Sequence, residues 1–327
     1  MLGERATSPA RLRVAGLIAA GSAVVVWGSS SVLVKEIKGV SGVAISFHRL
    51  WMGTVITAMV FLLSGGRYSW RLIRLSLAGG IAFALDIVLF FTAIKETSVA
   101  NATVIGALQP VLVLAIAKRL FGEQPRWSDG LWAGVAIAGA VVVVTGASAG
   151  GPANTRGDLL AVGALFAWTW YFVASKRARR DLGSFEYLAG LSLVAAAALT
   201  PVVLLSGERI GVPETQGWLT IAALAIVNGA LGHFLMNWAH GYVPIMVVSL
   251  LTLAIPVFAA ASAAIFIDEP VTLVQVAGMT VVLSALTLVV IRTSRRVPEA
   301  VEPQGTPMVE YINKPGDRYL PGSADHG

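Results

Sequence analysis

Three strongly polar residues interrupt the apolar stretches in the first third of the chain. His48 and Arg49 are adjacent in one apolar run, and Asp86 stands in the next. A charged side chain inside a membrane costs at least about 3 kcal/mol and is usually paired. We therefore expect Arg49 and Asp86 to form a buried ion pair, with His48 at the same depth. Such a pair is either purely structural or a switch in which Asp86 takes up a proton, or binds an ammonium group, when the pair opens.

A stretch containing a proline occurs twice. Pro110 and Pro256 each lie inside an apolar run, and a glutamate, Glu123 or Glu269, follows thirteen residues later. A proline breaks a soluble helix, but membrane helices tolerate it because neighbouring groups satisfy the freed carbonyl. The carbonyl freed near Gly106 either binds a substrate ammonium or belongs to a structural kink. We expect the two glutamates to cap the N-terminus of the helix that follows, where negative charge is favoured; a gating role is the alternative.

Polar and aromatic side chains in these and other apolar runs are candidates for lining a substrate cavity. Hydroxyl and amide groups can hydrogen-bond a solute, aromatic rings can hold apolar groups or cations, and histidine can take up a proton. The alternatives are hydrogen bonds and close packing between helices and, for the aromatic residues, an interfacial belt. The candidates are Trp27, Ser29, Ser30, Asn101, Gln109, Pro110, Trp168, Tyr171, Asn228, His233, Asn237, Ser249 and Pro256.

The composition indicates a membrane protein. Of the 327 residues, 56% are hydrophobic and only 13% are charged, and the mean hydropathy is +0.76; soluble domains carry about 25% charged residues. The chain has no cysteine, which excludes disulfides, thiol catalysis and cysteine-ligated metals, and we expect no metal or other cofactor. The net charge of +6 does not indicate nucleic-acid binding, because the basic residues stand in loops, where they set membrane topology.

Ten runs meet the length of a membrane helix, which needs about 20 mostly apolar residues. They are Val14–Val34, Val43–Leu63, Leu72–Ile94, Val99–Ala117, Trp127–Thr145, Leu159–Ala174, Phe185–Leu205, Trp218–Trp238, Val243–Ile267 and Leu273–Ile291. We therefore expect an all-α polytopic membrane protein. Residues 1–13 should form a cytoplasmic N-terminus, and residues 293–327, rich in proline, glycine and glutamate, a disordered cytoplasmic tail.

Charge and internal repetition give the expected topology. With the N-terminus inside, sixteen lysines and arginines fall in inside loops and five outside, which predicts that both termini are cytoplasmic. The halves also repeat, since Lys35 matches Lys176 at the offset that relates other residues of the first and sixth helices. Each half holds five helices, an odd number, so the second half is inverted in the membrane. Two inverted repeats, 14–146 and 157–292, give a basis for alternating access.

The sequence resembles the EamA-type transporters of the drug/metabolite transporter superfamily over about residues 14–292. The resemblance rests on the ten-helix count, the duplication, the two loop glutamates, and the motif residues Trp27, Gly28, Ser29, Ser30, Ala102, Leu108 and Pro110. It implies a carrier of small polar metabolites, often amino acids, and often an exporter. It also implies a central cavity lined mainly by helices one, three, four, six, eight and nine, whereas substrate identity does not carry over.

We therefore expect a secondary transporter in the cell membrane that exports amino acids or related small metabolites by alternating access. A drug or lipophilic-cation efflux carrier is the alternative, because a cavity acid with aromatic rings fits both. A membrane-embedded enzyme or a scaffold is more distant, since the sequence has no HExxH, no GxSxG, no paired acids and no glycine-rich ATP-binding loop. The expected partners are a small-molecule substrate and the lipid bilayer, and a homodimer stays open.

Overall fold

The computed structural model describes residues 9–97, 99–146, 154–205, 210–211, 213–266, 268 and 270–294. Every regular element among these residues is a helix, and ten helical stretches are long and apolar enough to cross a membrane. The predicted all-α polytopic fold with ten spans is confirmed. Glu269 and the predicted tail beyond residue 294 lie outside the described residues.

The ten spans are built from single helices and from helices in pieces. The first half comprises α1 (Pro9–Gly28), α2 (Ser30–Glu36), α3 (Gly42–Leu63), α4 (Trp70–Glu96), α5 (Val99–Gly106), α6 (Gln109–Phe121) and α7 (Trp127–Thr145). The second half comprises α8 (Thr155–Ala178), α9 (Ser184–Leu205), α10 (Thr215–Ala223), the π-helix η1 (Leu224–Leu231), α11 (Gly232–His240), α12 (Ile245–Leu251), the 3-10 turn η2 (Thr252–Ala254), α13 (Ile255–Phe266) and α14 (Leu273–Ser294).

Most helices extend beyond the apolar runs that predicted them, and the first and sixth spans are examples. The first begins at Pro9 instead of Val14, and the sixth span covers Thr155–Ala178 instead of Leu159–Ala174. Polar residues at a helix end continue the helix when their groups are satisfied. At the start of α8 the side chain of Asn154 accepts a hydrogen bond from the first turn, which an apolar run cannot signal.

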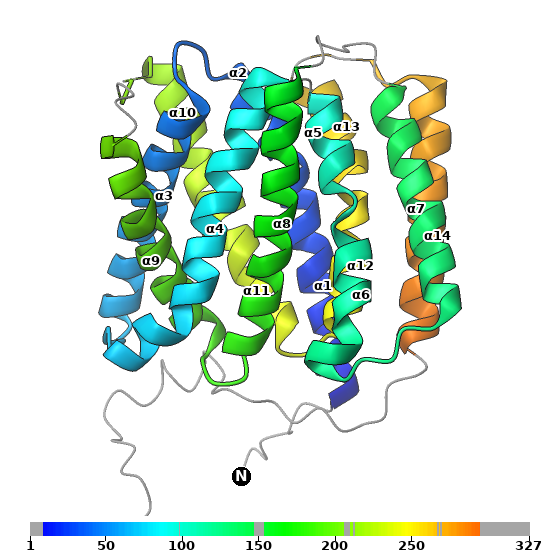
Figure 1. Ribbon diagram of the computed structural model, residues 1–327, viewed down its shortest axis with the longest axis horizontal. Coiled ribbons are helices and arrows are strands. Elements are labelled where there is room, and N and C mark those ends of the chain that lie inside the picture. The colour runs from blue at the N-terminus through cyan, green and yellow to red at the C-terminus, as the bar shows by residue number, and fades with distance from the viewer. Residues whose placement is uncertain are drawn as a thin grey trace, which may run out of the picture.

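The two halves pack as inverted repeats (Figure 1). Spans at equivalent positions lie against each other: α3 contacts α9, α6 contacts α12, and α7 contacts α14. The remaining pairs cross over, with α1 against α11 and α4 against α8. The helices α7 and α14 stand together at one edge of the bundle, as Figure 1 shows. We call the side on which α1, α4 and α9 begin the N-terminal face, at the bottom of Figure 1, and the other side the opposite face.

Glycines let the peripheral pair α7 and α14 approach closely. A Cβ atom at Gly278 would lie 2.8 Å from the Gly139 carbonyl oxygen, so neither position has room for a side chain. Small residues at helix contacts replace the hydrophobic driving force that a lipid environment lacks. The outer side of α14 exposes large apolar residues, among them Leu273 and Val274, as expected of a lipid-facing surface.

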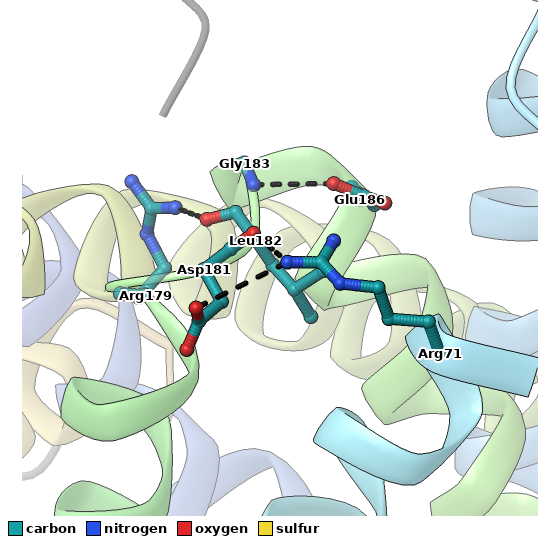
Figure 2. A network of polar contacts seen from close by, with 6 residues as sticks. All are labelled: Arg71, Arg179, Asp181, Leu182, Gly183 and Glu186. Carbon is teal, nitrogen blue, oxygen red and sulfur yellow. Dashed lines mark hydrogen bonds and ion pairs between the residues drawn. The ribbon is translucent and has the colours of Figure 1, made fainter. Parts of the chain in front are cut away.

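The turn between α8 and α9 is held by buried and exposed polar contacts on the N-terminal face (Figure 2). Arg179 donates from Nε to the Asn237 carbonyl at 2.9 Å and from Nη1 to the Leu182 carbonyl, and burial lowers the pKa of Arg179. Arg71, at the start of α4, donates to the Asp181 carbonyl at 3.2 Å and lies 4.0 Å from its carboxylate. The Arg71–Asp181 pair is more than half exposed, so it stabilises the turn little.

The loop glutamate of the first repeat caps a different helix from the one expected. The N-terminus of α7 is held by Asp129, whose carboxylate accepts from the Arg126 N–H at 2.8 Å. Glu123 instead accepts from the N–H groups of Ile245 and Met246, at 2.7 and 3.0 Å, at the start of α12. Glu123 therefore caps a helix N-terminus as expected, but the helix is α12 of the other repeat and not α7, which follows it in sequence.

Candidate functional site

A cavity of about 110 Å³ lies between the two repeats. The wall includes the C-terminal part of α4 and the N-terminal half of α8, so the cavity occupies the half of the bundle away from the N-terminal face. Spans one, three, four, six, eight and nine all contribute to it, and span two adds one arginine. The sequence candidates that line it are Trp27, Ser30, Arg49, Asp86, Trp168, His233 and Pro256.

Arg49 reaches the cavity from α3 and is only 4% exposed. Its Nε atom donates to the Leu224 carbonyl at 3.2 Å, and its guanidinium carbon lies 5.1 Å from the centre of the Phe91 ring. Leu224 begins the π-helix η1, where the wider hydrogen-bond pattern makes carbonyls available to outside donors. The Nη1 atom of Arg49 is buried and has no hydrogen-bond partner. The arginine is thus anchored at one nitrogen, whereas another is buried with an unused hydrogen-bond donor.

Asp86 lines the same cavity from α4 and makes no hydrogen bond or ion pair within the described part of the chain. The expected ion pair with Arg49 is therefore wrong: the two residues share a cavity but do not pair within 4.0 Å. The two helices bring both residues to one cavity, but the side chain of Arg49 turns toward span eight. His48 is not part of this group, since its Nε2 lies 3.0 Å from the Gly211 carbonyl and its ring 4.7 Å from that of Trp218.

Aromatic rings form one end of the cavity. Trp27 and Trp168, at equivalent positions of the two repeats, meet edge to face at 5.0 Å between ring centres, and His233 lies 4.8 Å from Trp27. Tyr171 stands behind them, where its hydroxyl lies 2.9 Å from Nδ1 of His233 and donates to the Asn237 side chain at 3.2 Å. Tyr171 and Asn237 do not touch the cavity but fix the orientation of the histidine that does.

A second set of hydrogen bonds fastens span one to the π-helix. Trp27 donates from Nε1 to the Asn228 carbonyl at 2.9 Å. The Asn228 side chain donates in turn to the Val26 carbonyl at 2.6 Å and to the Ser29 hydroxyl at 3.2 Å. Gly232 leaves room for the indole, because a Cβ there would lie 2.6 Å from Trp27 Nε1. Asn228 and Ser29 thus join helices, and neither lines the cavity.

The helix turns that precede the two prolines form part of the cavity wall. Gly106 and Thr252, each four positions before a proline, lie on the cavity wall. Pro256 lines the cavity as well, whereas Pro110 does not. Gln109, beside Pro110, is completely buried, and neither of its amide atoms has a hydrogen-bond partner.

The remaining sequence candidates lie away from the cavity. Asn101 donates to the Asp158 carboxylate at 3.2 Å, close to the opposite face. Ser249 donates to the Met246 carbonyl of its own helix at 2.9 Å. Neither residue lines the cavity.

Sequence reasoning missed several residues of the wall. Phe90, Phe91, Thr103 and Thr252 all line it. The phenylalanines gave no signal, because they continue an ordinary apolar run. Thr252 could have been found, since it holds the position before Pro256 that Gly106 holds before Pro110. In the described part of the chain no cluster of three or more histidine or acidic residues could hold a metal ion.

The model of the EamA-like transporter family matches residues 14–145 and 155–291, one match in each repeat. The chain belongs to the EamA-like transporter family. That family is part of the drug/metabolite transporter superfamily, so the resemblance seen in the motifs is confirmed, and the chain is a multi-pass membrane protein of a transporter family. A crystal structure described only as that of a protein is similar, with a TM-score of 0.72 and 20% identity over 86% of this chain and 98% of that one, which shows the fold. No curated protein matches the chain by sequence.

Proposed function

We propose that the chain is a secondary transporter of the cell membrane that moves small zwitterionic metabolites, above all α-amino acids with apolar side chains, by alternating access. One observation carries the proposal. A cavity between the two inverted repeats holds one buried arginine, Arg49, and one buried carboxyl group, Asp86, which are not paired with each other.

The charges of the cavity match those of an α-amino acid. A substrate carboxylate can accept from the free Nη1 of Arg49, and a substrate ammonium can donate to Asp86, both as charge-assisted hydrogen bonds. An uncompensated buried charge is costly, and a zwitterion neutralises both groups in one event. The rest of the wall is largely apolar, including Ile87, Phe90 and Leu165, and suits an apolar substrate side chain.

The efflux of lipophilic cations is less favoured by the same geometry. Asp86 and the Trp27–Trp168 pair could hold a cation. The cation would, however, share the cavity with the guanidinium of Arg49, and like charges at close range repel. Arg49 is therefore the residue that separates the two candidate functions.

Alternating access and orientation rest on the repeats and on charge. Inverted repeats permit one packing that opens to each face. The excess of lysine and arginine in loops of the N-terminal face supports cytoplasmic termini, and the cavity then lies toward the outside. Export is proposed from the resemblance to EamA-type carriers.

Counterflow into liposomes that contain the purified chain tests the substrate class. Liposomes loaded with leucine should accumulate labelled leucine. The matched amine without a carboxylate, 3-methylbutylamine, and the matched acid without an ammonium, 4-methylpentanoate, should exchange poorly. Exchange of tetraphenylphosphonium with no exchange of any neutral amino acid would replace this proposal by cation efflux.

A further inference from the structure

Two turns at equivalent places in the repeats lie on opposite faces of the bundle. One joins α4 to α5 on the opposite face, and the other joins α11 to α12 on the N-terminal face. Lys35 donates to the carbonyls of Ile94 and Thr97 at 2.8 and 3.3 Å. Lys176, its counterpart, donates to the two equivalent carbonyls of the α11–α12 turn at 2.8 and 2.6 Å. Each lysine thus ties a turn to a helix of its own repeat.

On the N-terminal face a carboxylate from the other repeat holds the turn. Glu123 belongs to the first repeat, and both of its oxygens accept hydrogen bonds from the backbone of the second repeat, at Ile245 and Met246. Hydrogen bonds to an ionised carboxylate are about twice as strong as neutral ones. Glu123 is therefore a strong link between repeats on this face.

On the opposite face a carboxylate of the second repeat does the same for the α4–α5 turn. Asp158, in the first turn of α8, accepts from the Thr97 hydroxyl at 2.8 Å and from the Asn101 amide at 3.2 Å. The start of α8 and the α4–α5 turn are in close contact here, because a Cβ at Gly157 would lie 2.7 Å from the Thr97 Cβ. Asp158 and Glu123 thus reach across the repeats in opposite directions, on opposite faces.

The two kinds of bond behave differently if the repeats move as units. The lysine bonds stay within one repeat and can persist, whereas the carboxylate bonds join the repeats and must break on the face that opens. We propose that Glu123 and Asp158 are gate residues of the carrier, with Glu123 closing the N-terminal face and Asp158 closing the opposite face. The inference rests on the alternating access proposed above.

Each face also offers a matched control. Arg71 and Asp181 pair between the repeats on the N-terminal face, and Arg156 and Glu96 pair at 3.4 Å on the opposite face. The arginine side chains are 58% and 78% exposed, and exposed ion pairs contribute little. Removing either arginine should therefore not open its face.

The absence of cysteine from the chain makes the gates measurable. A single cysteine at Ala164, on the cavity wall, can be labelled by a membrane-impermeant maleimide added to one side of oriented vesicles. A hydrogen bond to a charged group shifts an equilibrium by about tenfold or more. Glu123→Ala should therefore speed labelling from the N-terminal face by about tenfold, and Asp158→Ala from the opposite face by a similar factor. Arg71→Ala and Arg156→Ala should label at the parent rate.

Conservative variants separate gating from a loss of folding. Asp158→Asn keeps an acceptor for both donors and Glu123→Gln keeps one acceptor, but both lose the charge, so both should label at rates between those of the parent and the Ala variant. If an Ala variant does not fold, Thr97→Val and Glu123→Gln must still shift labelling toward opposite faces.

The labelling needs no substrate, so it is independent of the proposed amino acid. Opposite shifts without any leucine counterflow would support the gates and reject the substrate class. Labelling that rises from the same face in both Ala variants, or in neither, would overturn the gates even if leucine counterflow proceeds.

Discussion

Gly106 and Thr252 lie on the wall of the same cavity, each four residues before the proline of its own repeat. In an α-helix the carbonyl at such a position accepts from the N–H four residues later. Pro110 and Pro256 have no N–H to donate, so each repeat brings one weakened turn of backbone to the cavity.

Replacing either proline should slow transport without unfolding the protein. Pro110→Ala and Pro256→Ala restore the missing N–H and let the helix run through the break. A straightened helix that favours one access state by ~1.4 kcal/mol would slow counterflow about tenfold. The initial rate of leucine counterflow measures this, with thermal unfolding as the check on folding. Pro201→Ala, at an exposed proline within α9, is the control, and wild-type rates in both cavity variants would reject the idea.

Asp86 and Arg49 should discriminate between the two ends of the substrate. Loss of one hydrogen bond to a charged group costs ~1.5–3 kcal/mol, so Asp86→Asn and Arg49→Gln should each raise the KM for leucine about 10- to 100-fold. Asp86→Asn should not further slow the poor exchange of the acid without an ammonium, and Arg49→Gln should not further slow that of the amine without a carboxylate. Because no ion pair joins the residues, the double variant should not recover transport. Thr92→Val, on α4 but away from the cavity, should leave the KM unchanged.

The space beside Trp27 gives a prediction for Gly232. In Gly232→Ala the new Cβ would stand 2.6 Å from Trp27 Nε1, so the indole must move and lose its bond to Asn228. Overpacking of this kind lowers the free energy of unfolding by ~1–3 kcal/mol, and the displaced ring should narrow the cavity and reduce counterflow. Gly21→Ala, at a glycine with no atoms within 4 Å of its built Cβ, should be neutral or stabilise by up to ~1 kcal/mol. Equal behaviour of the two variants in denaturation and counterflow would contradict this account.

Glu123 should give the protein a pH dependence of a definite sign. Burial raises its pKa above the ordinary 4.5, against the opposing effects of the Met246 N–H, Lys176 and the Ile245 N–H. The folded state then holds this proton at a pH at which the unfolded state has lost it. The contribution of Glu123 to the free energy of unfolding is therefore fully present below 4.5 and falls as the pH rises through the raised pKa. As the pH rises from below 4.5 through the raised pKa, the free energy of unfolding of wild type should therefore fall relative to that of Glu123→Gln, and a relative rise over this window would contradict the sign. The neutral carboxyl is also a weaker acceptor, so acid should speed maleimide labelling from the N-terminal face in wild type and not in Glu123→Gln.

Reporter fusions test the orientation. The bias of basic residues predicts that fusions after Arg126 and Arg180 report a cytoplasmic location and that a fusion near Thr215 reports the outside. The start of α7, which follows Arg126, and the start of α10, at Thr215, lie on different faces of the bundle, so the same report from both would contradict the inverted arrangement.

The fold followed from the sequence because a membrane imposes a length on every span and makes lone charges conspicuous. Ten apolar runs, two prolines and two tryptophans at repeated spacing were enough to predict ten spans in two repeats. The position of a residue along its helix could also be predicted, because it is counted from the start of that helix. This count placed Arg49 and Asp86 near each other, and both line the same cavity.

The direction in which a side chain points from its helix, and its partners on distant segments, could not be predicted from the sequence. Arg49 turns to the Leu224 carbonyl, which is available because span eight contains a π-helix, and nothing in the apolar run Leu224–Leu231 distinguishes it from an α-helix. Asp158 resembled an ordinary acid in the first turn of a helix, which the helix dipole favours anyway. Its contacts with Thr97 and Asn101 depend on how the repeats dock, which is a property of the assembled bundle.

The π-helix also makes the two halves unequal. Two identical inverted repeats would give an inward-open and an outward-open form that are related by a two-fold rotation and have the same free energy. The stretch of α4 at the position of η1 is a regular α-helix, and Gly232 stands where symmetry would place a counterpart of Asp86. If the carrier works by the alternating access proposed above, the empty protein should therefore rest mostly in one of its two forms, and a difference of only ~1.4 kcal/mol would set that resting ratio at about ten to one. In such a carrier solute gradients would decide the net flux, whereas this preference would decide from which side the empty protein binds its next substrate.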